Sequence, residues 1–351
     1  MVNSAVEDLP TVPEPSVEAR REAVARHDAL AVAVGGLGRL AELGCWLASV
    51  QGTCPPHAPL RPRVVVVAAD HGIAAAAVSA YPAGTTALQV TAARDRTMPA
   101  AVVAPVASAS VRIVDAGLDD PGAPDAAEPR YRVRRGSGRI DVEDALTEDE
   151  TDAALRIGRA LADEEVDAGA DLLVPGSLGV GATTAASTLV AAVTGIEPVA
   201  VVGRGSGIDD NTWMRKAAAV RDALRRTRPV RRDPVGLLRT AGGADIAVLT
   251  GFLLQASLRR TPVLLDGLVV TTAALLAEQL APGARRWWLA GQRSPEPAVG
   301  PLLERLALEP VLDLGIRLGD GTGALAVVPM LQMAARLLAD TAPRASAATG
   351  T

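Results

Sequence analysis

A repeating unit of buried strand, glycine-bearing turn and helix constrains the fold of this chain more than any other feature. Each unit begins with a short apolar run that ends in a polar residue or a glycine, as strands buried on both faces do. Six such runs are predicted as strands, at residues 63–72, 111–115, 171–176, 198–202, 262–267 and 286–290. Because strands alternate with helical patterns, the sequence predicts an α/β fold with a mainly parallel sheet and helices on both faces.

The two ends of the chain differ from this repeat. Between residues 17 and 51, apolar positions recur at helical spacing on both sides of a glycine-rich turn, which predicts a helical subdomain. Residues 1–18 and 342–351 have the composition of disordered ends.

Composition excludes several classes of function. A net charge of -5 and an aromatic content of 2% argue against nucleic-acid binding, which needs basic surfaces or stacking platforms. An unbroken apolar stretch approaching 18 residues is missing, and so is an apolar leader, so neither membrane spanning nor secretion is expected. Cys45 and Cys54 lack a second pair or a histidine cluster, which indicates neither a disulfide framework nor a zinc site. We expect a globular cytoplasmic protein.

Two glycine-rich turns precede predicted helices, at residues 177–184 and 203–210. The first offers backbone N–H groups at a helix start together with threonine hydroxyls, an arrangement that receives a phosphate. It matches neither the Walker nor the dinucleotide pattern, and a plain tight turn is the alternative. Lys216 follows the second turn by about two helical turns, either as a cation of the same site or as a solvated surface lysine.

Acidic residues also stand at the predicted strand ends. Asp70 and His71 follow the first strand, where ligands dock in parallel sheets, or they form a hydrogen-bonded structural pair. Asp320 lies in a glycine-rich turn at residues 317–323 before the last helix. Its carboxylate either faces a cleft or caps that helix.

An ordered set of motifs between residues 24 and 340 resembles one family, the nicotinate mononucleotide:dimethylbenzimidazole phosphoribosyltransferases of cobalamin lower-ligand assembly. The motifs are Asp-His-Gly-Ile at 70–73, Val-Ser-Ala-Tyr-Pro at 78–82, Gly-Arg-Gly-Ser-Gly-Ile-Asp-Asp at 203–210 with Arg-Lys at 215–216, Gly-Gly-Ala-Asp at 242–245, Leu-Asp-Gly at 265–267, Arg-Ser and Glu-Pro within 293–297, and Arg-Leu-Gly-Asp-Gly-Thr-Gly at 317–323. The resemblance implies a Rossmann-like large domain at 61–300, a small helical domain from 19–60 with parts of 300–341, and a homodimer or a heteromer with a paralogue.

The resemblance also implies a reaction. The nitrogen of dimethylbenzimidazole or a related azole attacks the ribose C1 carbon of nicotinate mononucleotide, nicotinate leaves, and an α-ribazole phosphate forms by inversion. The family's general base is a carboxylate in the last motif, which here is Asp320. The matching substrate-binding positions are Ser79, Tyr81, Gln89 and Leu318 for the aromatic base, and Gly179, Gly181, Thr183, Gly203, Gly205, Lys216 and Ser294 for the nucleotide. The family uses no metal and no cofactor.

Several positions depart from the family pattern. Asp320 replaces the usual Glu, Ser177 an acidic residue, Ala182 an Asn and Gln292 a His, and the usual segments at 31–36 and 96–100 are changed. Asp is as acidic as Glu but shorter by one methylene, and a misplacement of about 1 Å can cost roughly a hundredfold in rate. Two hypotheses stay open: an enzyme that uses Asp320 as its base, and a catalytically weak or inactive homologue that acts as a partner subunit or ligand-binding protein.

Overall fold

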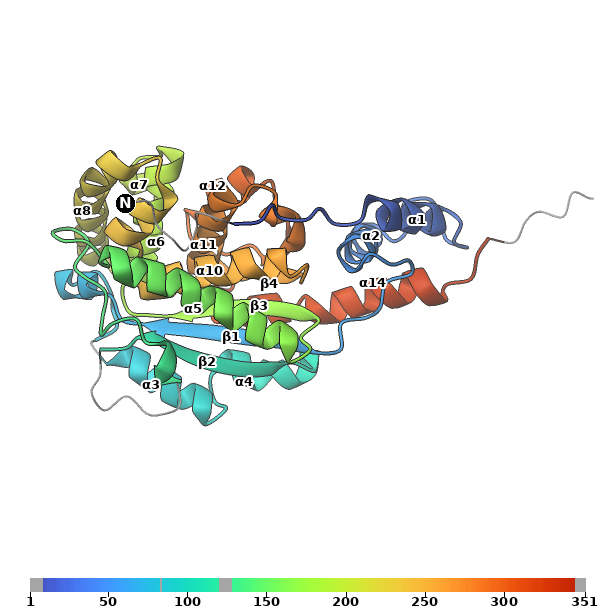
Figure 1. Ribbon diagram of the computed structural model, residues 1–351, viewed down its shortest axis with the longest axis horizontal. Helices are drawn as coiled ribbons and strands as arrows, with labels where there is room; N and C mark the ends of the chain where they lie inside the picture. The colour runs from blue at the N-terminus through green and yellow to red at the C-terminus, as the bar shows by residue number, and fades with distance from the viewer. Residues whose placement is uncertain (1–8, 83, 120–127, 345–351) are drawn as a thin grey trace, which may run out of the picture.

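A six-stranded parallel sheet forms the centre of the molecule (Figure 1). The computed structural model describes residues 9–82, 84–119 and 128–344 of the 351-residue chain. The strands lie in the order β2-β1-β3-β4-β5-β6, and each neighbouring pair is parallel. Their bounds are β1 Pro62–Ala69, β2 Ser110–Gly117, β3 Leu172–Leu178, β4 Val263–Leu265, β5 Trp288–Gln292 and β6 Pro310–Leu312.

Helices cover both faces of the sheet, because successive side chains of a strand point to opposite sides. One face packs against α5 (Glu148–Asp167), α6 (Ala182–Thr194), α8 (Asp210–Thr227), α10 (Ala244–Leu258), α11 (Gly267–Leu280) and α12 (Val299–Leu306). The other face packs against α3 (Thr85–Arg94), α4 (Pro99–Val103), α13 (Thr322–Leu325) and α14 (Val328–Asp340). In β1, Val65 and Val67 belong to the first core, and Val64 and Val66 belong to the second. The predicted fold class is confirmed.

The strand predicted at residues 198–202 is wrong, because this segment forms the short helix α7 (Pro198–Val201). Proline suits the first turn of a helix, where its missing N–H is not needed, and Pro198 occupies that position. Val199 is exposed, whereas a strand inside the sheet would bury it. The second glycine-rich turn therefore follows a helix and lies outside the sheet. By contrast, α5 begins where its sequence signals a helix start, with a capping box formed by Thr147 and Glu150.

Helices from the N-terminal and C-terminal parts of the chain pack together at one end of the molecule (Figure 1). Helices α1 (Val17–Asp28) and α2 (Arg39–Gln51) contact α14. Arg26 Nε donates to the carbonyl of Leu338 at 2.6 Å, so residues 312 positions apart are joined directly. The assignment of this region as a separate small domain stays a prediction.

The described parts of the predicted disordered ends take part in this packing. Ser16 caps α1 by accepting a hydrogen bond from the Ala19 N–H, and Val12 is buried. At the other end, the Ala342 carbonyl accepts from the Ala31 N–H at 2.9 Å. The structure therefore differs from the prediction at residues 9–18 and 342–344, while 1–8 and 345–351 lie outside the described residues.

Helices α5 and α10 approach until their backbones touch. A Cβ atom on Gly158 of α5 would lie 1.9 Å from the Val248 carbonyl oxygen of α10. In return, a Cβ atom on Gly251 of α10 would lie 2.2 Å from the Leu155 carbonyl oxygen. Only glycine fits at these two positions, so the paired glycines set the distance between the helices.

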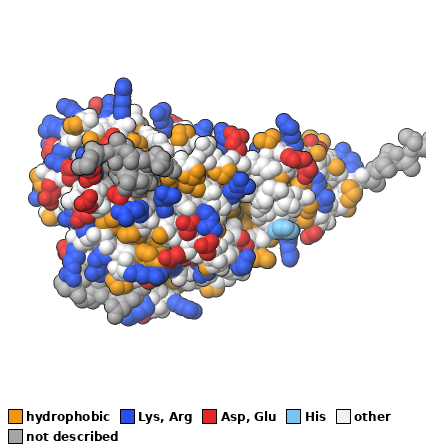
Figure 2. All heavy atoms as spheres, viewed as in Figure 1, with side chains coloured by type: hydrophobic (Ala, Val, Ile, Leu, Met, Phe, Trp, Pro, Cys, Tyr) orange, Lys and Arg blue, Asp and Glu red, His pale blue; other side chains and the backbone are white. Residues whose placement is uncertain are grey.

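Charged side chains of both signs are intermingled on the face of the molecule shown in Figure 2. One helical stretch, Thr322–Asp340, has the length and apolar composition to cross a membrane, but half of it is buried inside the protein. Buried helices of a protein core commonly share this composition.

Candidate active site

A cleft of about 150 Å³ lies beside the carboxyl end of β3. It is lined by nine of the eleven predicted substrate-binding residues, namely Ser79, Tyr81, Gln89, Gly179, Gly181, Thr183, Gly205, Lys216 and Leu318. Gly203 and Ser294 are outside this lining. The carboxyl edge of a parallel sheet is where α/β proteins bind ligands, so the predicted positions meet at a suitable place.

The first glycine turn forms one wall of the cleft. A Cβ atom on Gly179 would lie 2.3 Å from the Ala69 carbonyl oxygen, so the close approach of β1 requires glycine. Gly181 has φ 97° and precedes α6, whose first turn receives no side-chain cap. The Ala182 and Thr184 N–H groups of that turn donate to the carbonyls of Gly179 and Gly181, while the Thr183 hydroxyl lines the cleft as a hydrogen-bond donor, which suits an anionic group.

Lys216 is the cation of this wall. Its side chain comes from α8, is only 2% exposed, and donates from Nζ to Thr183 Oγ1 at 2.8 Å. The alternative of a solvated surface lysine is wrong. Burial lowers the pKa of Lys216 to about 8, and the nearby Glu296 carboxylate partly offsets that effect.

This depressed pKa leads to a prediction about ligand binding. Lys216 carries its charge below about pH 8 and loses it above, so affinity for a phosphate-bearing ligand is expected to fall up to about tenfold per pH unit above 8. Titration calorimetry with nicotinate mononucleotide between about pH 6.5 and 9.5 measures this effect. The Lys216→Arg variant stays charged and is the control, for which we expect a flat profile. A flat profile in the unchanged protein would contradict this role.

The opposite wall is more apolar and partly open. Tyr81 and Leu318 are about half exposed, at 48% and 53%, although both side chains line the cleft. Ser79 Oγ lies 3.2 Å from Ser206 Oγ, which ties this wall to the second glycine turn. Exposed apolar side chains beside polar groups are the surface that a flat aromatic ligand covers.

Asp320 lies at the edge of the cleft but outside its lining. It is 2% exposed, and its carboxylate accepts hydrogen bonds from the Ala100 N–H at 3.2 Å and the Thr322 N–H at 3.0 Å. The second bond pairs the first N–H of α13, whose N-cap position is held by Gly321, so the carboxylate is bonded at the start of the helix without being its N-cap. Arg317 and Leu318 of the same turn line the cleft, whereas the Asp320 carboxylate does not.

Asp266, at the end of β4, holds the turn that carries Asp320. Asp266 Oδ2 accepts from the N–H groups of Gly321 and Gly323, at 3.0 and 3.2 Å. Burial and then the neighbouring Asp320 raise the pKa of Asp266 to about 6. The Leu-Asp-Gly motif brought this residue into the resemblance, but nothing in the sequence assigned it this positioning role.

A buried polar chain supports the floor of the cleft. Ser177 lines the cleft and donates to Asp245 Oδ2 at 3.1 Å, while Asp245 Oδ1 lies 3.1 Å from His71 Nε2. Burial acts to lower the pKa of His71, but Asp245 outweighs it and the pKa is raised. Asp70 accepts from the Thr86 hydroxyl at 2.6 Å. Asp70 and His71 therefore both have partners within the protein, but these are Thr86 and Asp245, so the predicted hydrogen-bonded pair of Asp70 with His71 is wrong.

Comparisons with known proteins agree on one family. A family model described as "Phosphoribosyltransferase" matches residues 12–349. The nicotinate-nucleotide–dimethylbenzimidazole phosphoribosyltransferase of Mycobacterium avium (strain 104) is 54% identical over 341 residues, which cover 97% of each chain. The protein of the same name from Mycobacterium tuberculosis (strain ATCC 25618 / H37Rv) is 53% identical over 346 residues, 97% of this chain and 94% of its own. The chain belongs to this phosphoribosyltransferase family.

A solved structure of the same family supports the assignment. The crystal structure of CobT from Thermus thermophilus superposes with a TM-score of 0.88 at 38% identity, covering 93% of this chain and 97% of its own. The predicted resemblance is therefore confirmed. The chain therefore matches this phosphoribosyltransferase family in both sequence and fold.

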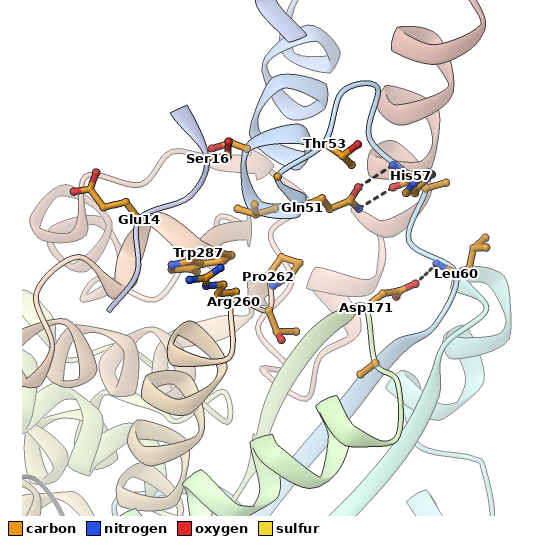
Figure 3. A pocket seen from close by; sticks show the side chains of 16 residues that line it. Glu14, Ser16, Gln51, Thr53, His57, Leu60, Asp171, Arg260, Pro262 and Trp287 are labelled. Atoms are coloured by element: carbon orange, nitrogen blue, oxygen red, sulfur yellow. Dashed lines mark hydrogen bonds between the residues drawn. The ribbon is translucent and has the colours of Figure 1, made fainter. Parts of the chain in front are cut away.

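A second cavity, of about 560 Å³, lies at the opposite edge of the sheet (Figure 3). Leu60, Asp171, Pro262 and Trp287 line it just before β1, β3, β4 and β5 begin, so it opens at the amino ends of the strands. Asp171 accepts from the Leu60 N–H at 2.8 Å. This cavity shares no lining residue with the cleft beside the glycine turns, and its Asp171 carboxylate is already bonded within the protein.

Sequence reasoning gave no role to Glu296, although its Glu-Pro motif belongs to the resemblance. It is the one carboxylate among the residues that line the cleft, and it is 6% exposed. Its Oε1 atom accepts from the Gly205 N–H at 3.0 Å. The glycine at 203 leaves room for it, because a Cβ atom there would lie 1.9 Å from Glu296 Oε2. In the sequence, the indication of a role for Glu296 in the site is that this acidic residue stands within a motif of the family.

Proposed function

We propose that this protein transfers the ribose phosphate of nicotinate mononucleotide to dimethylbenzimidazole or a related azole, giving an α-ribazole phosphate and nicotinate. The observation that carries the proposal is the pairing, in one cleft, of a glycine turn and buried Lys216 with the half-exposed Tyr81 and Leu318. Relatives that are 53–54% identical bear the name of this activity.

The two walls divide the substrates by their chemistry. The donors of the first turn and Lys216 suit the phosphate, whereas Tyr81 and Leu318 suit the flat apolar azole. Bound in this way, the azole nitrogen and the ribose C1 carbon are held side by side, which lowers the entropic part of the barrier. Asp320 is the proposed base that removes the azole proton as the new bond forms.

The direct test incubates the purified protein with nicotinate mononucleotide and a panel of azoles, and follows nicotinate release and ribazole phosphate formation by chromatography. We expect both products in equal amounts. Absence of nicotinate release with every azole would overturn the proposal and favour the non-catalytic, ligand-binding homologue.

Lengthening the proposed base is expected to increase the rate. In Asp320→Glu the carboxylate extends one methylene further, and if short reach limits the reaction, kcat should rise by up to about a hundredfold. Steady-state kinetics with dimethylbenzimidazole measures this change. An unchanged or lower kcat, with the melting temperature preserved, would contradict the reach explanation.

The proposal includes a cytoplasmic homodimer. Cys45 and Cys54 are both free thiols, which suits a reducing compartment. Exposed apolar side chains occur on α3, on α4 and just after α4, at Leu88, Val102 and Val106. Exposed apolar surface is commonly covered in an oligomer. Light scattering is expected to give twice the chain mass of 35.9 kDa, whereas a heteromer with a paralogue would leave the purified chain monomeric.

A further inference from the structure

Glu296 is placed in the cleft in an unusual way for a carboxylate. The residue is buried, with only 6% exposed, and Oε1 is fixed by the Gly205 N–H at 3.0 Å. Its other oxygen, Oε2, is buried and has no hydrogen-bond partner among the described residues. A buried carboxylate oxygen without a donor is costly, so such an oxygen in a binding cleft calls for a donor from a ligand.

Lys216 and Glu296 both lie beside Gly205. A Cβ atom on Gly205 would lie 3.2 Å from Lys216 Nζ and 3.2 Å from Thr183 Oγ1, while the Gly205 N–H points to Glu296. Among the described residues, the ammonium and the carboxylate form no ion pair; Lys216 bonds to Thr183 instead. The cleft thus holds a cation and a free carboxylate oxygen near each other, and each still has bonding capacity.

This combination selects one class of ligand group. The cationic side attracts a phosphate, whereas the free Glu296 oxygen repels anions and accepts only from a donor. A ribose 5-phosphate carries both features on one small frame, an anionic phosphate and neutral hydroxyl donors. The aromatic azole also carries one N–H donor, but in the proposed reaction Asp320 accepts that proton, so the ribose hydroxyls are the donors left for Glu296.

We propose that Glu296 is a specificity-determining residue that accepts a hydrogen bond from a ribose hydroxyl of the nucleotide and so distinguishes ribose from deoxyribose. This inference rests on the proposed function for the identity of the nucleotide. The Gly205 N–H aims the carboxylate, and the glycine at 203 gives it space.

The experiment compares dissociation constants for nicotinate mononucleotide and its 2′-deoxy and 3′-deoxy analogues, by titration calorimetry on the full chain. For the unchanged protein, we expect at least one deoxy analogue to bind about 10- to 100-fold more weakly. In Glu296→Ala the parent nucleotide should lose a similar factor, while the discrimination against that analogue should shrink to about twofold or less. Because binding is measured, the result does not depend on turnover.

Two further variants separate this role from a structural one. Glu296→Gln keeps the volume and the acceptor for the Gly205 N–H but removes the charge, and it should reduce the discrimination while the melting temperature is preserved. Glu304→Gln, an exposed carboxylate on α12, is the matched control and should change nothing. If all three nucleotides lose affinity equally in both Glu296 variants, the residue only holds the turn and the proposal is overturned. Tighter binding of nicotinate mononucleotide to Glu296→Gln would also overturn it, because the carboxylate would then compete with the phosphate.

Failure of this inference and of the proposed function give different results. A protein that binds the three nucleotides with the expected discrimination but releases no nicotinate retains the Glu296 assignment and loses the transferase activity. A protein that turns over nicotinate mononucleotide with equal discrimination in all variants retains the activity and loses the assignment.

Discussion

Replacing Asp320 with Asn is expected to lower kcat for transfer by about 10²- to 10⁴-fold, the usual contribution of a general base. Asn can still accept from the Thr322 N–H at the start of α13 through its amide oxygen. It cannot accept the azole proton. For Asp320 to reach that proton, we expect its carboxylate to turn away from the Ala100 N–H toward the cleft.

The effect of Asp320→Asn on stability can be measured separately from its effect on kcat. An amide nitrogen in place of Oδ2 would face the Ala100 N–H donor, which costs about 1–3 kcal/mol if the amide cannot turn. Thermal unfolding reports that cost, and steady-state assays with dimethylbenzimidazole report kcat. A kcat within about threefold of the unchanged protein would show that Asp320 only bonds the start of α13 and does not act as the base.

Replacing Gly158 with Ala is expected to destabilise the protein by about 3 kcal/mol, at the upper end for overpacking. The added methyl would lie 1.9 Å from the Val248 carbonyl oxygen and 2.7 Å from the Phe252 nitrogen, and both are backbone atoms that cannot rotate away. Helices α5 and α10 would have to separate along their crossing. Thermal unfolding should show a melting temperature lower by roughly 5 °C or more.

The matched control is Gly300→Ala on α12. A Cβ atom there meets nothing within 4 Å, and alanine is the better helix former, so this variant should be neutral or slightly stabilising, by about 0.5–1 kcal/mol. An equal loss in both variants would indicate a general effect of the substitution. A neutral Gly158→Ala would mean that α5 and α10 can move apart freely.

The fold followed from sequence because its signals are local and repeated. The apolar runs at β1 and β3 are continuous, and the capping box at the start of α5 is complete, so strand and helix are each specified by neighbouring residues. The strand predicted at residues 198–202 was wrong because an apolar run such as Pro-Val-Ala-Val suits both a buried strand and a short helix. The exposure of Val199, which decides between them, depends on distant packing.

The site was predictable as a set of positions but not as a geometry. Nine of the eleven predicted substrate-binding residues line one cleft, because the family motifs identify which sequence positions form the site. The burial of Lys216 arises where α8 packs against α6, and the hydrogen bond from Ala100 to Asp320 arises where α4 packs against α13, neither of which sequence spacing encodes. Glu296 was missed as a binding residue for the same reason, because its partner Gly205 is 91 positions away.

The joining of the chain ends also sets the order in which the protein can be completed during synthesis. Helices α1 and α2 are synthesised before the surface they pack against, around Leu338 of α14. At about 5–20 residues per second, roughly 15–60 s separate the two. The face of the sheet that packs against α5 and α10 can be covered in that interval, whereas the other face, like α1 and α2, keeps apolar surface uncovered until α14 has been made. A message truncated before α14 would therefore yield a chain in which α1, α2 and one face of the sheet remain partly uncovered.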